Sequence, residues 1–251
     1  MKKSKPPQSI ADRVVAIAAD LRDRVDDLDF GPSVPWVYNP LNYAWQTHEQ
    51  YLRRYVNESC RVLLLGMNPG PWGMAQTGVP FGEISAVVDF LGIDAPVKKP
   101  ASEHPKRPVE GLNCKRSEVS GQRLWGLFQT RFKKPEKFFE QHFVANYCPL
   151  VFMEESAKNL TPDKLPIAVR KPLEEICDEH LAKLVESLAP DWVIGVGGFA
   201  EDCANRVLSE RLAGSAVKIG RILHPSPASP AANRDWSGTA TKQLIELGIW
   251  K

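Results

Sequence analysis

The stretch Arg61–Glu83, RVLLLGMNPGPWGMAQTGVPFGE, decides the fold of this chain. It opens with an apolar run, Val62 to Leu65, and then changes abruptly to glycine, proline and amide residues. A buried parallel strand has this pattern when it delivers a loop to the carboxyl edge of a sheet, where open α/β sheets bind their ligands. We therefore expect a strand at 61–66 followed by a ligand-binding loop.

The loop that follows this strand mixes flexible and rigid residues. Its glycines allow sharp turns and close approach to a ligand, whereas its prolines stiffen the backbone. It also carries large apolar side chains, which loops normally lack unless those side chains pack or bind something flat. These are Met67, Trp72, Met74 and Phe81. The composition favours a pre-formed pocket over the alternative, a structural turn in which Asn68 acts as a cap.

Length and composition indicate the broad class of protein and the number of domains. The chain has 251 residues, of which 43% are hydrophobic and 25% charged, with a net charge of +2. These values are ordinary for a globular protein that buries a core. No internal repeat or change in composition divides the sequence, so we expect one domain over residues 1–251.

Several protein classes are disfavoured by simple patterns. The N-terminus, MKKSKPPQS, is basic but no apolar segment follows it, and no run reaches membrane-spanning length. Lys2, Lys3 and Lys5 are too few to indicate nuclear targeting. None of the five cysteines lies in a CxxC or zinc-type spacing, so we expect free thiols and an intracellular protein without membrane contact.

Apolar periodicity predicts helices that alternate with strands. Ser9 is the expected N-cap of the first helix, whose stripe runs from Ile10 to Val25. Further helices are expected at 41–55, 84–91, 122–132, 173–188, 199–207 and 240–247, and strands at 61–66, 143–145, 192–196 and 217–223. This order predicts a three-layer α/β/α sandwich around a short, mostly parallel four-stranded sheet.

A second glycine loop, Gly195-Val-Gly-Gly-Phe199, resembles a dinucleotide fingerprint only superficially. It lacks the GxGxxG spacing, and no acidic residue follows a second strand where a ribose would need it. Close packing between a strand and the next helix explains these glycines better.

Three polar residues are expected at strand ends on one sheet edge: Asn68, Asn146 and His224. Each has an ordinary structural explanation, as a turn residue, a cap and a satisfied histidine respectively. The ordinary explanation is the better one for any single residue. It weakens for the set, because all three residues end strands at one sheet edge beside an aromatic-rich loop. An asparagine amide offers a donor and an acceptor, which suits the edge of a nucleobase.

The segment from Lys98 to Arg123 is irregular and rich in cations. A solvated, charged loop is the ordinary explanation for such a run. A phosphate-contacting arm is the functional alternative, because lysine and arginine side chains release counterions when they neutralise phosphates. The local sequence leaves both open.

Three segments resemble one known family. GMNPGPWGMAQTGVPFGE, NYCPL and HPSPASPAANRDW are similar to motifs of the single-strand-selective monofunctional uracil-DNA glycosylases, within the uracil-DNA glycosylase superfamily. The likeness runs from about Leu41 to Trp236. HPKRPVEGLNCKRSEVSGQRLWG also looks like family sequence, which favours DNA contact by the cationic run.

The resemblance implies hydrolysis of the N-glycosidic bond of uracil, or 5-hydroxymethyluracil, in DNA by base flipping, which initiates base excision repair. It implies a water-positioning role for Asn68 and contact of His224 with uracil O2. Phe81 would stack on the base and Asn146 would recognise its Watson–Crick edge. The residues expected to line the base-binding pocket also include Met67, Gly70 and Met74, the last two around the pyrimidine 5-position.

DNA contacts are implied for a further group of residues, among them the loop that wedges into the duplex: Lys106, Arg107, Ser120, Pro225, Ser226, Pro227 and Ala228. No metal or cofactor is expected. The implied partner is single- or double-stranded uracil-containing DNA, bound by a monomer in the nucleoid or cytoplasm of a bacterium or the nucleus of a eukaryote. Two positions depart from the family: Ala228 replaces an expected arginine, and Trp72 an expected phenylalanine.

Two other functional classes are weighed against this one. A non-catalytic DNA-damage or nucleotide-binding module on the same fold would bind without releasing free base. An unrelated hydrolase or phosphate-transfer enzyme is disfavoured, because the sequence has no P-loop, no GxSxG and no clustered carboxylate pair.

Overall fold

The computed structural model describes residues 8–251, so Lys2, Lys3 and Lys5 lie outside the described residues. Its centre is a four-stranded sheet in which every pairing is parallel. The strand order is β3-β2-β6-β7. The strands are β2 (Val62–Gly66), β3 (His142–Asn146), β6 (Trp192–Val196) and β7 (Lys218–Ile222). All four predicted strands are confirmed, with ends shifted by a residue at most.

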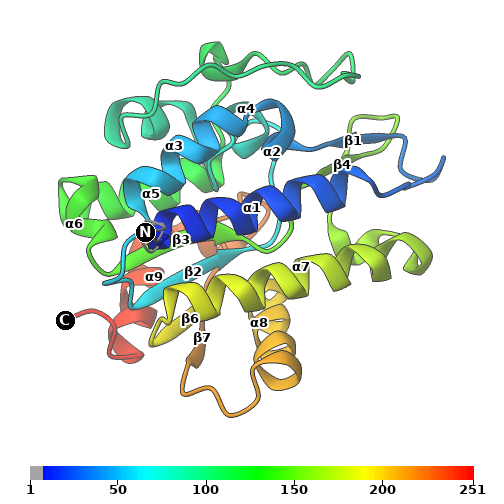
Figure 1. The fold of residues 1–251 in the computed structure, drawn as a ribbon. Coiled ribbons are helices and arrows are strands. Elements are labelled where there is room, and N and C mark those ends of the chain that lie inside the picture. The colour runs from blue at the N-terminus through cyan, green and yellow to red at the C-terminus, as the bar shows by residue number, and fades with distance from the viewer. Residues whose placement is uncertain (1–7) are drawn as a thin grey trace, which may run out of the picture.

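Helices cover both faces of this sheet, as predicted (Figure 1). The chain moves outward from β2 to β3 and then returns past β2 to β6 and β7. Because right-handed crossovers in opposite directions fall on opposite faces, the helices separate into two layers. One layer holds α5 (Val119–Phe132), α6 (Pro135–Phe139) and α9 (Pro230–Glu246); the other holds α1 (Ile10–Asp26), α7 (Ile167–Leu188) and α8 (Gly198–Arg211).

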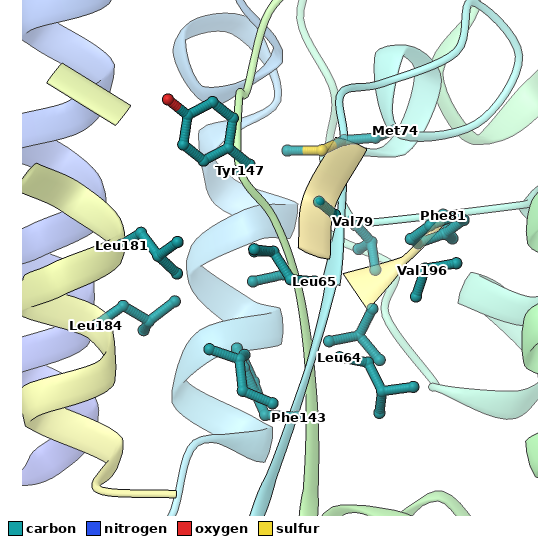
Figure 2. Close-up of a cluster of buried hydrophobic side chains, with 14 of the residues drawn as sticks. Leu64, Leu65, Met74, Val79, Phe81, Phe143, Tyr147, Leu181, Leu184 and Val196 are labelled. Atoms are coloured by element: carbon teal, nitrogen blue, oxygen red, sulfur yellow. The ribbon is translucent and has the colours of Figure 1, made fainter. Parts of the chain in front are cut away.

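Alternating side chains of the strands fill the space between the layers. Figure 2 shows Leu65 and Phe143 turned toward Leu181 and Leu184 of α7, while Leu64 points to the opposite side of the sheet. Leu64, Leu65 and Phe143 are all buried. The period of two therefore places successive leucines of β2 in different halves of the core.

The N-terminal helices pack beside the edge strand. Ser9 caps α1 as predicted, its Oγ accepting a hydrogen bond from the Asp12 N–H at 3.1 Å. The single helix expected at 41–55 is wrong: Ala44 has non-helical backbone angles and separates α2 (Pro40–Tyr43) from α3 (Trp45–Tyr55). From α3, the Tyr51 hydroxyl donates to the Val144 carbonyl of β3 at 2.8 Å.

Several short elements were not predicted. A small antiparallel sheet combines β1 (Trp36–Tyr38), β4 (Val151–Met153) and β5 (Asn159–Leu160). Strands of two or three residues carry too little alternation to be recognised. Further short segments are α4 (Met74–Thr77), the π-helix η1 (Ala86–Phe90) where an ordinary helix was expected, and the 3₁₀ helices η2 (Gly111–Asn113) and η3 (Pro162–Lys164).

All five cysteines are buried free thiols, as expected. Between residues 8 and 251, no helix is both long and apolar enough to cross a membrane.

Candidate active site

A cavity of about 520 Å³ lies at the carboxyl edge of the main sheet. It brings together residues from the loop after β2, the end of β3 and the loop after β7. Ten of the residues expected from the sequence line it: Met67, Asn68, Gly70, Met74, Phe81, Ser120, Asn146, His224, Ser226 and Ala228. The sheet therefore brings together residues that lie more than 150 positions apart in the sequence.

Asn146 ends β3 and turns its amide into this cavity. Its Oδ1 is buried and has no hydrogen-bond partner in the described part of the chain. Its Nδ2 lies 3.3 Å from the Met74 sulfur, a weak acceptor. A side chain at Gly66 would collide with both Asn146 Oδ1 and the Phe81 ring. Glycine at the end of β2 thus allows the amide and the aromatic ring to share one pocket.

Phe81 is held in an unusual backbone conformation. Its φ is +53°, in the left-handed region that costs a bulky residue free energy. Gly121 of α5 makes room for the Phe81 carbonyl, because a Cβ there would collide with that oxygen. The Phe81 ring lies 6.3 Å from the His224 ring, centroid to centroid. The surrounding structure holds Phe81 in this strained conformation, and the residue lines the cavity wall.

Asn68 is oriented by the NYCPL segment. Its Nδ2 donates to the Leu150 carbonyl at 3.1 Å. Since a carbonyl only accepts, this contact assigns the nitrogen and leaves Oδ1 as the acceptor offered by the side chain. An acceptor of this kind can hold a water molecule in place.

His224 is oriented by its own loop. Its Nδ1 accepts the Ser226 backbone N–H at 3.1 Å. Burial lowers the pKa of the imidazole, which favours the neutral ring. A neutral ring that accepts at Nδ1 carries its proton at Nε2, so His224 offers one N–H donor. A Cβ added at Gly197, where φ is +96°, would lie 3.1 Å from the His224 Cβ. The second glycine loop therefore packs against this histidine.

Gly195 from the same loop has the structural role expected for it. A Cβ there would collide with the backbone nitrogen of Glu201 in α8. Close packing of the strand on the helix is thereby confirmed.

The loop 225–229 is clamped by a network of hydrogen bonds. Arg123 of α5 donates to the Pro225 carbonyl at 3.0 Å and to Asn233 Oδ1 at 2.9 Å. Asn233 in turn donates to the Pro227 carbonyl at 2.8 Å. Pro225 is buried and Pro227 exposed, and neither lines the cavity. These bonds give the loop a fixed shape.

Lys106 and Arg107 also lie outside the cavity lining. Lys106 is exposed. The Arg107 guanidinium lies 5.1 Å from the centre of the Trp72 ring, and that of Arg116 lies 4.6 Å from it. The tryptophan therefore fixes two cations beside the loop that forms the pocket.

Five residues that line the cavity were not among the predicted site residues: Pro69 and Ser229, which adjoin predicted ones, and Glu118, Asn159 and Thr161. Asn159 and Thr161 come from β5 and the residue after it, in the small sheet that was not predicted. Glu118 directly precedes α5 in the segment SEVSG, and only that quoted likeness could have drawn attention to it. Glu118 Oε2 and Asn159 Oδ1 are buried without hydrogen-bond partners in the described structure.

Burial, aided by the charge of Glu83, raises the pKa of Glu118 to about 7, while the Gly70 backbone N–H opposes the rise. No group of three or more potential metal-ligating side chains occurs within residues 8–251.

Comparison with known proteins defines the class. The model of the Uracil DNA glycosylase superfamily matches residues 53–246, which include every strand and loop that forms the cavity edge. The chain belongs to this superfamily and is a uracil-DNA glycosylase, an enzyme of DNA repair that hydrolyses N-glycosidic bonds.

Similar proteins show which members of the superfamily this chain resembles. A protein from Bos taurus named single-strand selective monofunctional uracil DNA glycosylase is 46% identical over 249 residues, covering 99% of this chain and 91% of that one. Proteins of the same name from Mus musculus and Rattus norvegicus are 46% and 47% identical, each covering 96% of this chain and 86% of the relative. A crystal structure of wild-type SMUG2 from Pedobacter heparinus has the same fold, with a TM-score of 0.69, 19% identity, and coverage of 96% and 97%.

Proposed function

We propose that this chain extrudes uracil, and also 5-hydroxymethyluracil, from single- or double-stranded DNA into the cavity and hydrolyses its bond to deoxyribose. Uracil excision follows from membership of the superfamily. Base flipping, the wider substrate range and the residue roles are the proposal. We also infer that residues 1–251 work as one monomeric domain, in whichever compartment holds the DNA.

The buried Oδ1 of Asn146 is the observation that carries this proposal. An unpaired buried acceptor costs free energy until a ligand donor meets it. Uracil N3–H is such a donor, and the neighbouring O4 can accept from Nδ2 of the same amide. The Phe81 ring, close to Asn146 over Gly66, supplies the flat surface on which a pyrimidine stacks.

His224 stabilises the departing base. As the glycosidic bond breaks, uracil takes the bonding electrons and negative charge develops on its O2 oxygen. The Nε2–H of a neutral His224, oriented through Ser226, donates a hydrogen bond to that oxygen. Donors aimed at developing charge give electrostatic catalysis, and losing one typically costs about 10²–10³ in rate.

Asn68 positions the attacking water. Its Oδ1 accepts one water hydrogen while its Nδ2 stays bonded to Leu150. An amide is a far weaker base than a carboxylate, so the water attacks a sugar that already has oxocarbenium character. The C1′–N1 bond breaks and the C1′–O bond forms, and the proton that the water loses passes to the solvent or to the uracil anion. The rate therefore depends mainly on stabilising the departing uracil anion.

The surroundings of the cavity contact the DNA. Lys106 and Arg107 meet phosphates, Ser120 of the cavity lining contacts the DNA, and the loop 225–228 enters the base stack. Ala228 is too small to fill the space left by a flipped nucleotide. Duplex substrates, which must be unstacked, are therefore processed less readily than single strands, in keeping with the name shared by the relatives.

The direct assay uses two single-stranded oligonucleotides that differ only in uracil or thymine at one position, followed by alkali treatment. Strand cleavage at uracil, with no cleavage before alkali, is the expected result. Binding without an alkali-labile site would instead identify a non-catalytic module.

The assignment of Asn146 is tested by Asn146→Asp. The substitution replaces the Nδ2 donor by a second acceptor, which repels uracil O4 and suits the cytosine amino group. We expect excision of uracil to fall by about tenfold or more, the cost of an unpaired buried polar group, and the preference over cytosine to narrow. Single-turnover rates on matched uracil and cytosine oligonucleotides measure this, and an unchanged preference would refute the assignment.

A further inference from the structure

Glu118 is a partly buried residue in the wall of the cavity, and it has no part in the mechanism described above. Its backbone precedes α5, and its side chain turns back toward the loop after β2. A Cβ at Gly70 would collide with Glu118 Oε1, and a Cβ at Gly73 would collide with Oε2. The two glycines therefore provide the space that the carboxyl group occupies.

The carboxyl group has unused hydrogen-bonding capacity. Oε2 is buried and makes no hydrogen bond within residues 8–251. The same cavity is also lined by the apolar residues Met67, Met74 and Phe81. The raised pKa given above agrees with a carboxyl group that lacks a cationic partner. Such a group favours a ligand that brings a hydroxyl group to this wall.

The pose proposed above directs one edge of the base to this wall. In a pyrimidine ring, C5 lies opposite C2, so a base whose O2 faces His224 points C5 away from that histidine. Asn146 takes the N3 and O4 edge, next to C5 on the ring. The rest of the cavity lining, which includes Gly70, Glu118, Asn159 and Thr161, is left for the C5 edge.

We propose that Glu118 is a specificity-determining residue, whose carboxyl group beside Gly70 hydrogen-bonds a hydroxyl group carried on C5 of the flipped pyrimidine. This inference rests on the proposed function and deepens it. Either protonation state can bond a hydroxyl: the carboxylate as acceptor, the carboxylic acid as acceptor or donor. The apolar methyl group of thymine would instead desolvate the carboxyl group without replacing its hydrogen bonds.

The test compares oligonucleotides that differ only at C5 of one base, bearing hydrogen (uracil) or a hydroxymethyl group. Single-turnover excision is measured for wild type, Glu118→Met, which keeps the chain length but loses the hydrogen bond, and Glu118→Gln, which keeps a hydrogen-bonding head. The readout is the ratio of the 5-hydroxymethyluracil rate to the uracil rate in each protein.

We expect the ratio to fall about tenfold in Glu118→Met, which is the worth of one hydrogen bond, and to stay within about threefold of wild type in Glu118→Gln. Glu118→Ala gives the same ratio test if the methionine variant does not fold. A ratio unchanged in both the methionine and alanine variants, including a case where both rates fall together, would overturn the inference. Failure of the wild type to release uracil would instead contradict the proposed function.

Discussion

At the scale of single residues, the cavity is distinguished by acceptor oxygens that the protein leaves unpaired. Asn146 Oδ1, Asn159 Oδ1 and Glu118 Oε2 are buried and lack partners in the described chain, and all three residues line the same cavity. Each such atom costs about 1–3 kcal/mol. A fold tolerates this cost where a ligand supplies the missing donors, and uracil N3–H is one of them.

Replacing His224 by leucine tests the catalytic assignment. The substitution removes the Nε2–H that meets uracil O2, whereas the DNA-contacting cations remain. We expect single-turnover excision to fall by about 10²–10³. DNA affinity, measured by fluorescence anisotropy on the same oligonucleotide, should stay close to that of wild type. Excision at the wild-type rate would remove His224 from the mechanism.

Glu118 also makes a pH-dependent contribution to stability. Its pKa is about 7 in the folded chain against an ordinary 4.5, so the folded state retains a proton that the unfolded state has lost. Stability is therefore lost as the pH rises through the window from 4.5 to 7, by up to roughly 3 kcal/mol. The Glu118→Gln variant has no titrating group at this position, so it avoids this loss of stability.

We accordingly expect the stability of Glu118→Gln, relative to wild type, to be greater at pH 8 than at pH 5. Urea unfolding of both proteins at the two pH values measures the difference. A relative stability that is the same at both pH values would show that the carboxyl group is solvated or paired.

At the scale of elements, the loop 225–229 is shaped before DNA arrives. Arg123 of α5 and Asn233 of α9 hold its carbonyl groups, so the loop is fixed between two helices. A pre-organised loop spends less binding free energy on ordering when it enters the base stack. The shape of this loop should therefore matter most for duplex DNA, in which bases must be unstacked.

Arg123→Ala should therefore impair excision from duplex DNA about tenfold more than excision from single strands. Arg131→Ala is a matched control, because Arg131 lies on the same helix and also donates to a backbone carbonyl, that of Lys251 at 2.9 Å. The measurement is the ratio of duplex to single-strand rates for each variant. Equal ratios in the two variants would show that the clamp has no role in duplex DNA.

The same elements show what the sequence could and could not predict. The strands β2, β3 and β6 are mostly apolar and buried, whereas the edge strand β7 also carries the exposed residues Lys218 and Arg221. The pattern of the sequence identified all four strands, along with Asn68, Asn146 and His224 at or just after their ends. Asn159 lies in β5 and Thr161 directly follows it. This strand of two residues depends on pairing with β4 and has no local signal in the sequence. Glu118 was missed because its burial arises from Gly70 and Gly73, about 45 positions earlier, so only the folded chain shows it.

At the scale of the whole molecule, strand order explains where the cavity lies. The connection after β2 crosses one face of the sheet and the connection after β6 crosses the other, although the two strands are neighbours. Loops diverge at such a switch point and leave a crevice at the carboxyl ends of the strands. Gly66 at the end of β2 and Gly197 after β6 both lie there, beneath Phe81 and His224.

The position of a bound base tests this account most directly. In a crystal structure of the protein with free uracil, we expect the ring to stack on Phe81, with N3 and O4 bonded to Asn146 and O2 toward His224. A uracil ring bound elsewhere, away from Asn68, Phe81, Asn146 and His224, would contradict the central claim that this cavity holds the flipped pyrimidine.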